Sequence, residues 1–232
     1  MSLFHIRARF SVIISQQQST YTKLIFQLQV ASALDMKWAH ACGSKLTEEN
    51  LYYLACKAFR NNNLPMNTEE INKLVLSWPL FCKEALPDRN FTFWEWFYRL
   101  LILTQTHMQK LWSEGHVMGF ITKQAAENAL MDKPSGTFLL RFSDSELGGV
   151  TIAYVRKPDP FAPANVFMVA PFTTRNLSQR SMADVIFDIG DLTQLYPNTN
   201  KEVFKKFCTS STTQATQSNG YVRHTLVTQV EG

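Results

Sequence analysis

The chain has 232 residues, 45% of them hydrophobic, which is enough for one large or two small domains with real cores. Its net charge of +4 and its lack of basic blocks longer than Lys205-Lys206 give no sign of a nucleic-acid or membrane surface. The four cysteines lie far apart, without a CxxC pair or a histidine at zinc-ligand spacing. We therefore expect an intracellular protein with no metal site and no cofactor.

Residues 1–23 contain arginine and serine but no acidic residue, a composition faintly similar to a transit peptide. Their apolar core, Phe10 to Ile14, is rich in β-branched residues and too short for a secretory signal. This pattern favours a strand, with disorder as the alternative for this segment.

Residues 24–112 have helical periodicity. Leu51, Leu54 and Ala58 recur at helix spacing behind Thr47, a good N-cap residue, and the asparagines and Pro65 end that helix. The run "TFWE" from Thr92 is typical of a capping box that opens a second helix. The five tryptophans all fall in this half, at helical spacing, so we expect them to pack in a core: Trp38, Trp78, Trp94, Trp96 and Trp112.

From Gly119 onward the pattern changes. A short helix, "TKQAAENALM", precedes strand-like runs at 137–143, 149–156 and 165–170, and a further helix is expected near 178–188. Helix, antiparallel strands and helix together predict an α+β fold, with the sheet flanked by helices. We place this second domain at 113–208.

The segment "TSSTTQATQSN" after Cys208 is nearly all Ser, Thr, Gln and Asn, so we expect residues 209–232 to form a flexible tail. Within that tail the β-branched content returns, and an imagined strand would place Val222, Leu226 and Val230 on one side. A lone strand is not stable. These three residues are therefore expected to contact the strand of a partner.

The strand "TFLLRF" carries a single arginine. Because side chains alternate along a strand, Arg141 shares a face with Leu139 and Ser143. Its immediate neighbours supply no carboxylate on that face, and an unpaired guanidinium there would be costly. A guanidinium matches a phosphate through two parallel hydrogen bonds. The residues alone leave both a structural salt bridge and an anion site open.

The loop after this strand favours an anion. Ser143 and Ser145 offer hydroxyls, and the backbone amides from Asp144 onward can form a concave anion-binding nest. The Asp144 carboxylate would have to turn outward, leaving only its amide to contribute. Lys123, at the start of the preceding helix, adds a positive charge near that helix's positive end.

Two stretches carry a family resemblance. "GTFLLRFSDSELGGVTIAY" is similar to the central strand pair of an SH2 domain, the phosphotyrosine-binding module. Together with "GHVMGFITKQ", "RNFTFWEWF" and "WPLFCKEALP", it resembles the signal transducers and activators of transcription, the STAT family, over roughly residues 25 to 230. The resemblance implies an all-helical linker domain at 24–112, an SH2 domain at 113–208 and a tyrosine-containing tail. It also implies that residues 1–23 are the last strand of a DNA-binding domain.

The same resemblance implies a signalling function without enzymatic activity. The implied phosphotyrosine-binding residues are Lys123, Arg141, Ser143, Asp144 and Ser145, and Tyr221 is the implied phosphorylation site. The implied partners are a tyrosine kinase, receptor phosphotyrosines and a second STAT subunit bound by reciprocal SH2–phosphotyrosine contacts, as in JAK-STAT signalling. The chain would be cytoplasmic, and nuclear after phosphorylation. Contact with DNA would require a full-length form or partner.

Two alternatives remain. The first is an enzyme, but the spacing of Cys82 and Arg89 does not fit a cysteine phosphatase loop, and Gly148-Gly149 lacks the rest of a nucleotide-binding motif. The second is a truncated STAT that acts as a phosphotyrosine-binding adaptor or dominant-negative partner without DNA binding of its own.

Overall fold

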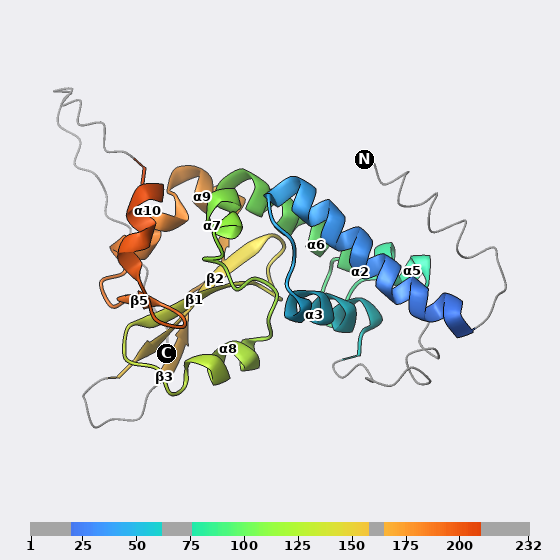
Figure 1. The fold of residues 1–232 in the computed structure, drawn as a ribbon, viewed down its shortest axis with the longest axis horizontal. Coiled ribbons are helices and arrows are strands. Elements are labelled where there is room, and N and C mark those ends of the chain that lie inside the picture. The colour runs from blue at the N-terminus through green and yellow to red at the C-terminus, as the bar shows by residue number, and fades with distance from the viewer. Residues whose placement is uncertain (1–19, 62–75, 158–164, 210–232) are drawn as a thin grey trace.

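A computed structural model of the chain describes residues 20–61, 76–157 and 165–209 (Figure 1). The strand expected before residue 20, the helix stop at Pro65 and the tail predictions for Tyr221, Val222, Leu226 and Val230 lie outside these ranges. The described residues form an α+β fold, as predicted: a helical half followed by a half built on one sheet.

The helical half starts at Thr20, ahead of the expected residue 24. Its helices are α2 (Thr20–Cys42), α3 (Glu48–Phe59), α5 (Trp78–Cys82), α6 (Phe93–Leu103), the π-helical turn η1 (Thr104–Met108) and α7 (Gln109–Ser113). Thr47 caps α3 by accepting from the Asn50 amide, and the capping box between Thr92 and Glu95 opens α6. Both predicted helix starts are therefore confirmed.

The second half is a sheet covered by helices on both faces. Its elements are α8 (Lys123–Leu130), β1 (Thr137–Phe142), β2 (Gly149–Arg156), β3 (Asn165–Met168), β4 (Phe172–Thr173), α9 (Thr174–Gln179), α10 (Met182–Asp188), β5 (Gln194–Leu195), β6 (Thr199–Asn200) and the 3-10 helix η2 (Lys201–Phe207). The strand order is β3-β2-β1-β5-β6, with β4 also paired to β2.

The central strands are antiparallel as predicted, because β1 pairs with β2 and β2 with β3 in that sense. The sheet as a whole is mixed, since β5 runs parallel to β1. Two predicted boundaries also differ. The third strand ends at Met168, and the helix expected near 178–188 is two helices, because Arg180 between them has an extended backbone.

The alternation predicted for β1 is confirmed. Phe138, Leu140 and Phe142 belong to the main core, on the sheet face covered by α9, α10 and η2. On the other face, Leu139 joins a smaller cluster with Ala126 and Leu130 of α8. Arg141 is on this second face, under the start of α8.

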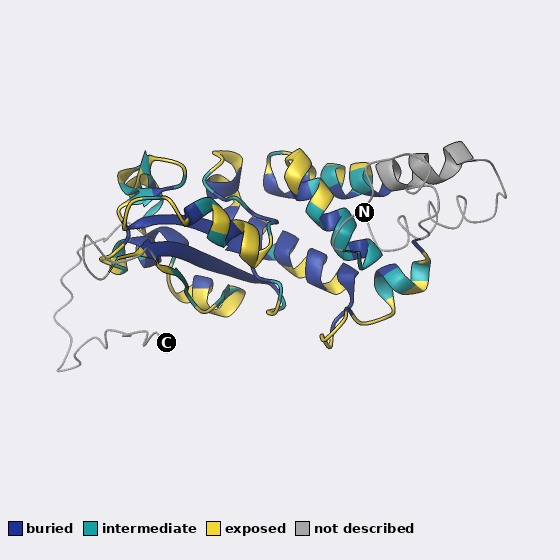
Figure 2. Cartoon of the chain, turned by 90° about the horizontal axis from the view of Figure 1, so that it is seen from below, coloured by how far each residue is buried: buried dark blue, intermediate teal, exposed yellow. Residues whose placement is uncertain are grey.

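The two halves share one continuous hydrophobic core (Figure 2). The ring of Trp38 on α2 lies 5.6 Å from that of Phe142 on β1 and 5.0 Å from that of Phe120. Aromatic pairs of this kind contribute about 0.5–1.5 kcal/mol each beyond their buried area. Four of the five tryptophans are buried, which confirms the predicted core packing for Trp38, Trp94, Trp96 and Trp112, while Trp78 is half-buried.

The junction between the halves is tightly packed at Gly119. This residue has φ +81°, and a Cβ added there would come within 2.8 Å of the Trp112 ring. Gly119 also pairs in parallel with Arg141 of β1, and its carbonyl accepts from the Phe142 amide at 2.8 Å. Glycine is therefore required here both by the backbone conformation and by the lack of space.

The described part of the chain, residues 20–61, 76–157 and 165–209, carries no sign of a membrane span or a metal site. Within it, no helix combines the length and apolar character that crossing a membrane requires. Nor do three or more His, Cys, Asp or Glu side chains of that part gather where they could hold a metal ion. The four cysteines all lie in the described part of the chain, and they are not joined in disulfides.

Candidate anion-binding site

Arg141 is a buried cation at the end of β1. The residue is 5% exposed, and its Nε and Nη2 atoms donate to the Ile121 carbonyl at 3.2 and 3.0 Å. Burial lowers the pKa of Arg141, whereas the nearby Glu127 carboxylate opposes that shift. A guanidinium starts from so high a pKa that it stays charged at neutral pH.

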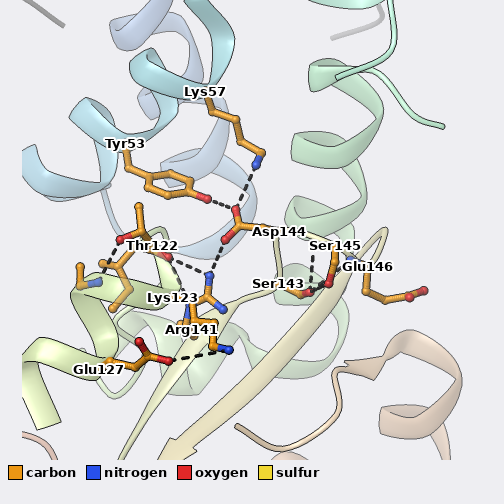
Figure 3. A network of polar contacts seen from close by, with 12 residues as sticks. Tyr53, Lys57, Thr122, Lys123, Glu127, Arg141, Ser143, Asp144, Ser145 and Glu146 are labelled. Atoms are coloured by element: carbon orange, nitrogen blue, oxygen red, sulfur yellow. Dashed lines mark hydrogen bonds and ion pairs between the residues drawn. The ribbon is translucent and has the colours of Figure 1, made fainter. Parts of the chain in front are cut away.

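The structure corrects the expected surroundings of Arg141. The sequence showed no carboxylate among its neighbours on that face, left a structural salt bridge open, and required Asp144 to turn outward beside a bound anion. Instead, Asp144 Oδ2 lies 2.5 Å from Arg141 Nη2 (Figure 3). The strand ends at Phe142, and the loop then curves back so that a residue three positions on reaches the guanidinium. Strand alternation alone could not reveal this contact.

Helix α3 of the helical half supplies two further partners of Asp144. The Tyr53 hydroxyl donates to Asp144 Oδ1, and Lys57 Nζ lies 3.0 Å from the same oxygen (Figure 3). From the loop before α6, Arg89 Nε donates to the Asp144 backbone carbonyl at 3.1 Å. The carboxylate therefore lies between cations from both halves of the molecule.

Sequence reasoning did not identify Tyr53, Lys57 or Arg89. For Tyr53 and Lys57 the sequence does contain one indication of a shared role. They are spaced i, i+4 on a helix and adjoin its buried residues Leu54 and Ala58. A lysine on the buried side of a helix indicates a partner for its charge, but not which partner.

Burial acts on both members of the Lys57–Asp144 pair. It raises the pKa of the Asp144 carboxyl to about 7. It lowers the pKa of Lys57 to about 8, with the positive charges of Arg89 and Arg141 adding to the effect. The Lys57 ammonium also lies 4.6 Å from the centre of the Trp96 ring, a favourable cation–π contact. Each charge is thus costly without its partner.

The loop after β1 is held from several sides. The Ser143 hydroxyl accepts from the amides of Ser145 and Glu146 at 3.3 and 3.1 Å, so two backbone donors converge on one oxygen. The Trp96 indole donates to the Ser143 carbonyl at 2.8 Å. Gly148, with φ +71°, packs against Arg99 of α6. Each amide has one hydrogen, so those of Ser145 and Glu146 would donate to a bound anion only after the Ser143 hydroxyl moves aside.

Lys123 lies at the first position of α8, beside Ile121, the residue whose carbonyl binds Arg141. Its side chain is 67% exposed, and its Nζ is 3.7 Å from Glu127 Oε1. The structure therefore brings Arg141, at the end of β1, together with Ser143, Asp144 and Ser145 of the loop that follows (Figure 3). Lys123 lies nearby at the start of α8. An exposed lysine can swing toward a bound anion.

A cavity of roughly 470 Å³ borders the site between α3 and the start of α8. Its lining residues include Tyr53, Lys57, Thr122 and Asp144. Asp144 forms part of its wall, and Arg141 contacts the opposite side of that carboxylate. The cavity thus gives the Asp144 side chain space on the side away from Arg141.

The arrangement is chemically suited to an anion with several oxygens. Arg141 and Lys57 contact the Asp144 carboxylate, Arg89 contacts the backbone carbonyl of the same residue, and the Ser143 and Ser145 hydroxyls lie in the same loop. A phosphate dianion uses several donors at once and prefers a guanidinium fork.

Comparison with known proteins agrees with this geometry. Residues 16–97 match the family model of the signal transducer and activator of transcription linker domain, and residues 116–196 match that of the SH2 domain. The chain is 38% identical over 195 residues to a protein of Anopheles gambiae named "Signal transducer and transcription activator". That match covers 84% of this chain and 26% of the relative, so the chain spans about a quarter of the protein it matches. With its linker and SH2 domains in sequence, the chain belongs to the STAT family.

Proposed function

We propose that the SH2 domain of this STAT-type signalling protein binds phosphotyrosine and that Arg141 recognises the phosphate. The observation that carries the proposal is the buried Arg141 guanidinium, which pairs with the Asp144 carboxylate that Lys57 also contacts. The Ser143 and Ser145 hydroxyls, the Asp144 amide and Lys123 would supply further contacts, and the amides of Ser145 and Glu146 would add to them once the Ser143 hydroxyl turns to the phosphate.

Calorimetric titration tests this assignment. The ligand is a peptide with the sequence of residues 216–226, "TQSNGYVRHTL", phosphorylated on its tyrosine, and the unphosphorylated peptide is the control. Loss of one member of a buried, hydrogen-bonded charge pair costs about 2–5 kcal/mol, so Arg141→Ala should weaken binding roughly thirtyfold or more. Lys123→Ala should cost less, because an exposed lysine contributes a flexible point charge.

Arg156→Ala is the matched control. Arg156 is an exposed strand arginine at the end of β2 whose Nε lies 3.5 Å from Asp191, so its loss should leave the affinity unchanged. Arg141→Lys keeps the charge but loses the fork, and should also bind weakly. Equal affinity of the wild type and a folded Arg141→Ala variant would refute the assignment.

The same pocket supports a finer proposal, reciprocal dimerisation. Phosphorylated Tyr221 would enter the pocket of a partner subunit, and Val222, Leu226 and Val230 would contact that partner. Receptor phosphotyrosines would use the same pocket, and a tyrosine kinase would modify Tyr221. Because the relative is named a transcription activator, we further propose a role in transcription regulation, with transfer from cytoplasm to nucleus after phosphorylation.

Light scattering tests the dimer. The segment from Phe207 to Tyr221 could stretch to about 45 Å, so its length also permits binding of the tail to its own pocket. A chain phosphorylated on Tyr221 should have twice the monomer mass at tens of micromolar. A monomer that no longer binds added phosphopeptide would indicate self-capture and contradict the dimer.

A further inference from the structure

With its present hydrogen bonds, the Arg141 guanidinium cannot form a two-pronged bond to a phosphate. Its Nη2 group donates to the Ile121 carbonyl at 3.0 Å and to Asp144 Oδ2 at 2.5 Å. A guanidinium nitrogen of this kind has two hydrogens, so both are engaged. A two-pronged bond from Arg141 to phosphate therefore requires Asp144 to release Nη2 first.

The Asp144 carboxylate has other partners and free space on the side away from Arg141. Its other oxygen, Oδ1, already accepts from the Tyr53 hydroxyl and lies 3.0 Å from Lys57 Nζ. The cavity of roughly 470 Å³, whose lining includes Tyr53, Lys57 and Asp144, is on that side. A small rotation of the side chain could thus break its contact with Arg141 while the carboxylate stays paired with Tyr53 and Lys57.

The charge of Lys57 makes this exchange favourable. The Asp144 side chain is 29% exposed and that of Lys57 is 18% exposed, so water solvates each of them only in part. An ionised carboxylate held there needs a cation close by. Among the described residues, Arg141 and Lys57 form the ion pairs with this carboxylate. Without Lys57, Asp144 would therefore stay on Arg141 and compete with the phosphate.

We infer that Lys57 and Tyr53 of the linker domain are positioning residues for phosphotyrosine binding, which hold the Asp144 carboxylate when phosphate displaces it from Arg141. The inference rests on the proposed function of the SH2 domain. The linker domain would then take part in recognition through the Asp144 side chain, which contacts residues of both domains. The phosphate itself would still be bound by SH2 residues.

A double-mutant cycle tests the inference, with the phosphopeptide of residues 216–226 as the probe. Lys57→Met should weaken binding about tenfold in the wild-type chain and less than about twofold in the Asp144→Asn background, where no carboxylate charge has to be moved. Lys57→Arg keeps a cation and should restore most of the affinity. Lys110→Met, which removes the same charge from an exposed position on α7, should have no effect.

Tyr53→Phe provides a second, milder variant in case Lys57→Met unfolds the chain. It should weaken binding about two- to fourfold, and again only when Asp144 is present. Equal losses for Lys57→Met in both backgrounds would mean that Lys57 attracts the phosphate directly, which overturns the inference alone. Unchanged affinity of folded Lys57→Met and Tyr53→Phe variants would also overturn it. Failure of the wild type to bind the phosphopeptide would overturn the proposed function, and the inference with it.

Discussion

The two faces of β1 are equally buried but differ in what surrounds them. Phe142 is 1% exposed and packs against Trp38 and Phe120, aromatic residues from outside the strand. Arg141, next to it, is 5% exposed and contacts a carbonyl and a carboxylate. Apolar burial stabilises the fold, whereas buried charge pairs give little net stability. The apolar face therefore joins the two domains, and the charged face is the better evidence of binding.

The largest expected effect is on the free energy of unfolding, to which the apolar face of β1 should contribute most. Phe142→Ala should lower the free energy of unfolding by about 3–5 kcal/mol, because it removes a ring from a fully packed core. Urea denaturation measures the loss, with Met131→Ala as control, since Met131 is 54% exposed and should change the free energy by less than about 0.5 kcal/mol. Similar losses for the two variants would contradict the packing described for β1.

A second variant tests Trp96, which packs in the apolar core and also contacts the loop after β1. Trp96 is fully buried in the core, yet its indole donates to the Ser143 carbonyl. Trp96→Phe should cost about 1–3 kcal/mol by leaving that carbonyl without its donor, and it should weaken phosphopeptide binding because the loop is less firmly held. Trp94→Phe is the matched control on the same helix, since its ring packs against Phe81 and Tyr98 instead of the loop. If both variants bind phosphopeptide equally well, the indole does not position the loop.

The smallest expected effect concerns pH and the charged face alone. The pKa of Asp144 in the folded chain is about 7, against about 3.9 for an unperturbed Asp. Between about pH 4 and pH 7 the folded state therefore binds more protons than the unfolded state, and the free energy of unfolding falls as the pH rises. Across this window the wild type should lose on the order of 1 kcal/mol more than Asp144→Asn.

Urea denaturation at pH 4.5 and pH 7.5 measures that difference. Lys57 acts in another window, because its pKa of about 8 lies below the ordinary value of 10.5. Its folded state binds fewer protons than the unfolded state between these values, so stability should rise with pH above about 8. Parallel stability curves for the wild type and Asp144→Asn below pH 7.5 would contradict the burial of the Asp144 carboxyl.

The same contrast explains what could be predicted from the sequence. The capping box at Thr92, the strand positions and the side-chain alternation around Arg141 follow from local rules of spacing and hydrogen bonding. The packing of the tryptophans follows from their size and periodicity. These features depend on residues a few positions apart, and the structure confirms them.

The charged cluster depends on contacts across long stretches of chain. Tyr53 and Lys57 are separated from Asp144 by 91 and 87 residues, and Arg89 by 55. Spacing in a single sequence does not specify which surface of α3 will meet which loop. The sequence does not specify the direction of the Asp144 side chain for the same reason, since two of its partners, Tyr53 and Lys57, are in the other domain.

The packing at Gly119 has a consequence for how this pair of domains could evolve. A domain can be joined to unrelated neighbours only where its own surface and core are complete without them. Here a break between Trp112 and Gly119 would uncover Phe120 and Phe142 and leave the glycine without the indole ring that it accommodates. Gene rearrangement is therefore expected to transmit the linker and SH2 domains as a single heritable unit, and substitutions at Trp112 and Gly119 should co-vary among descendants.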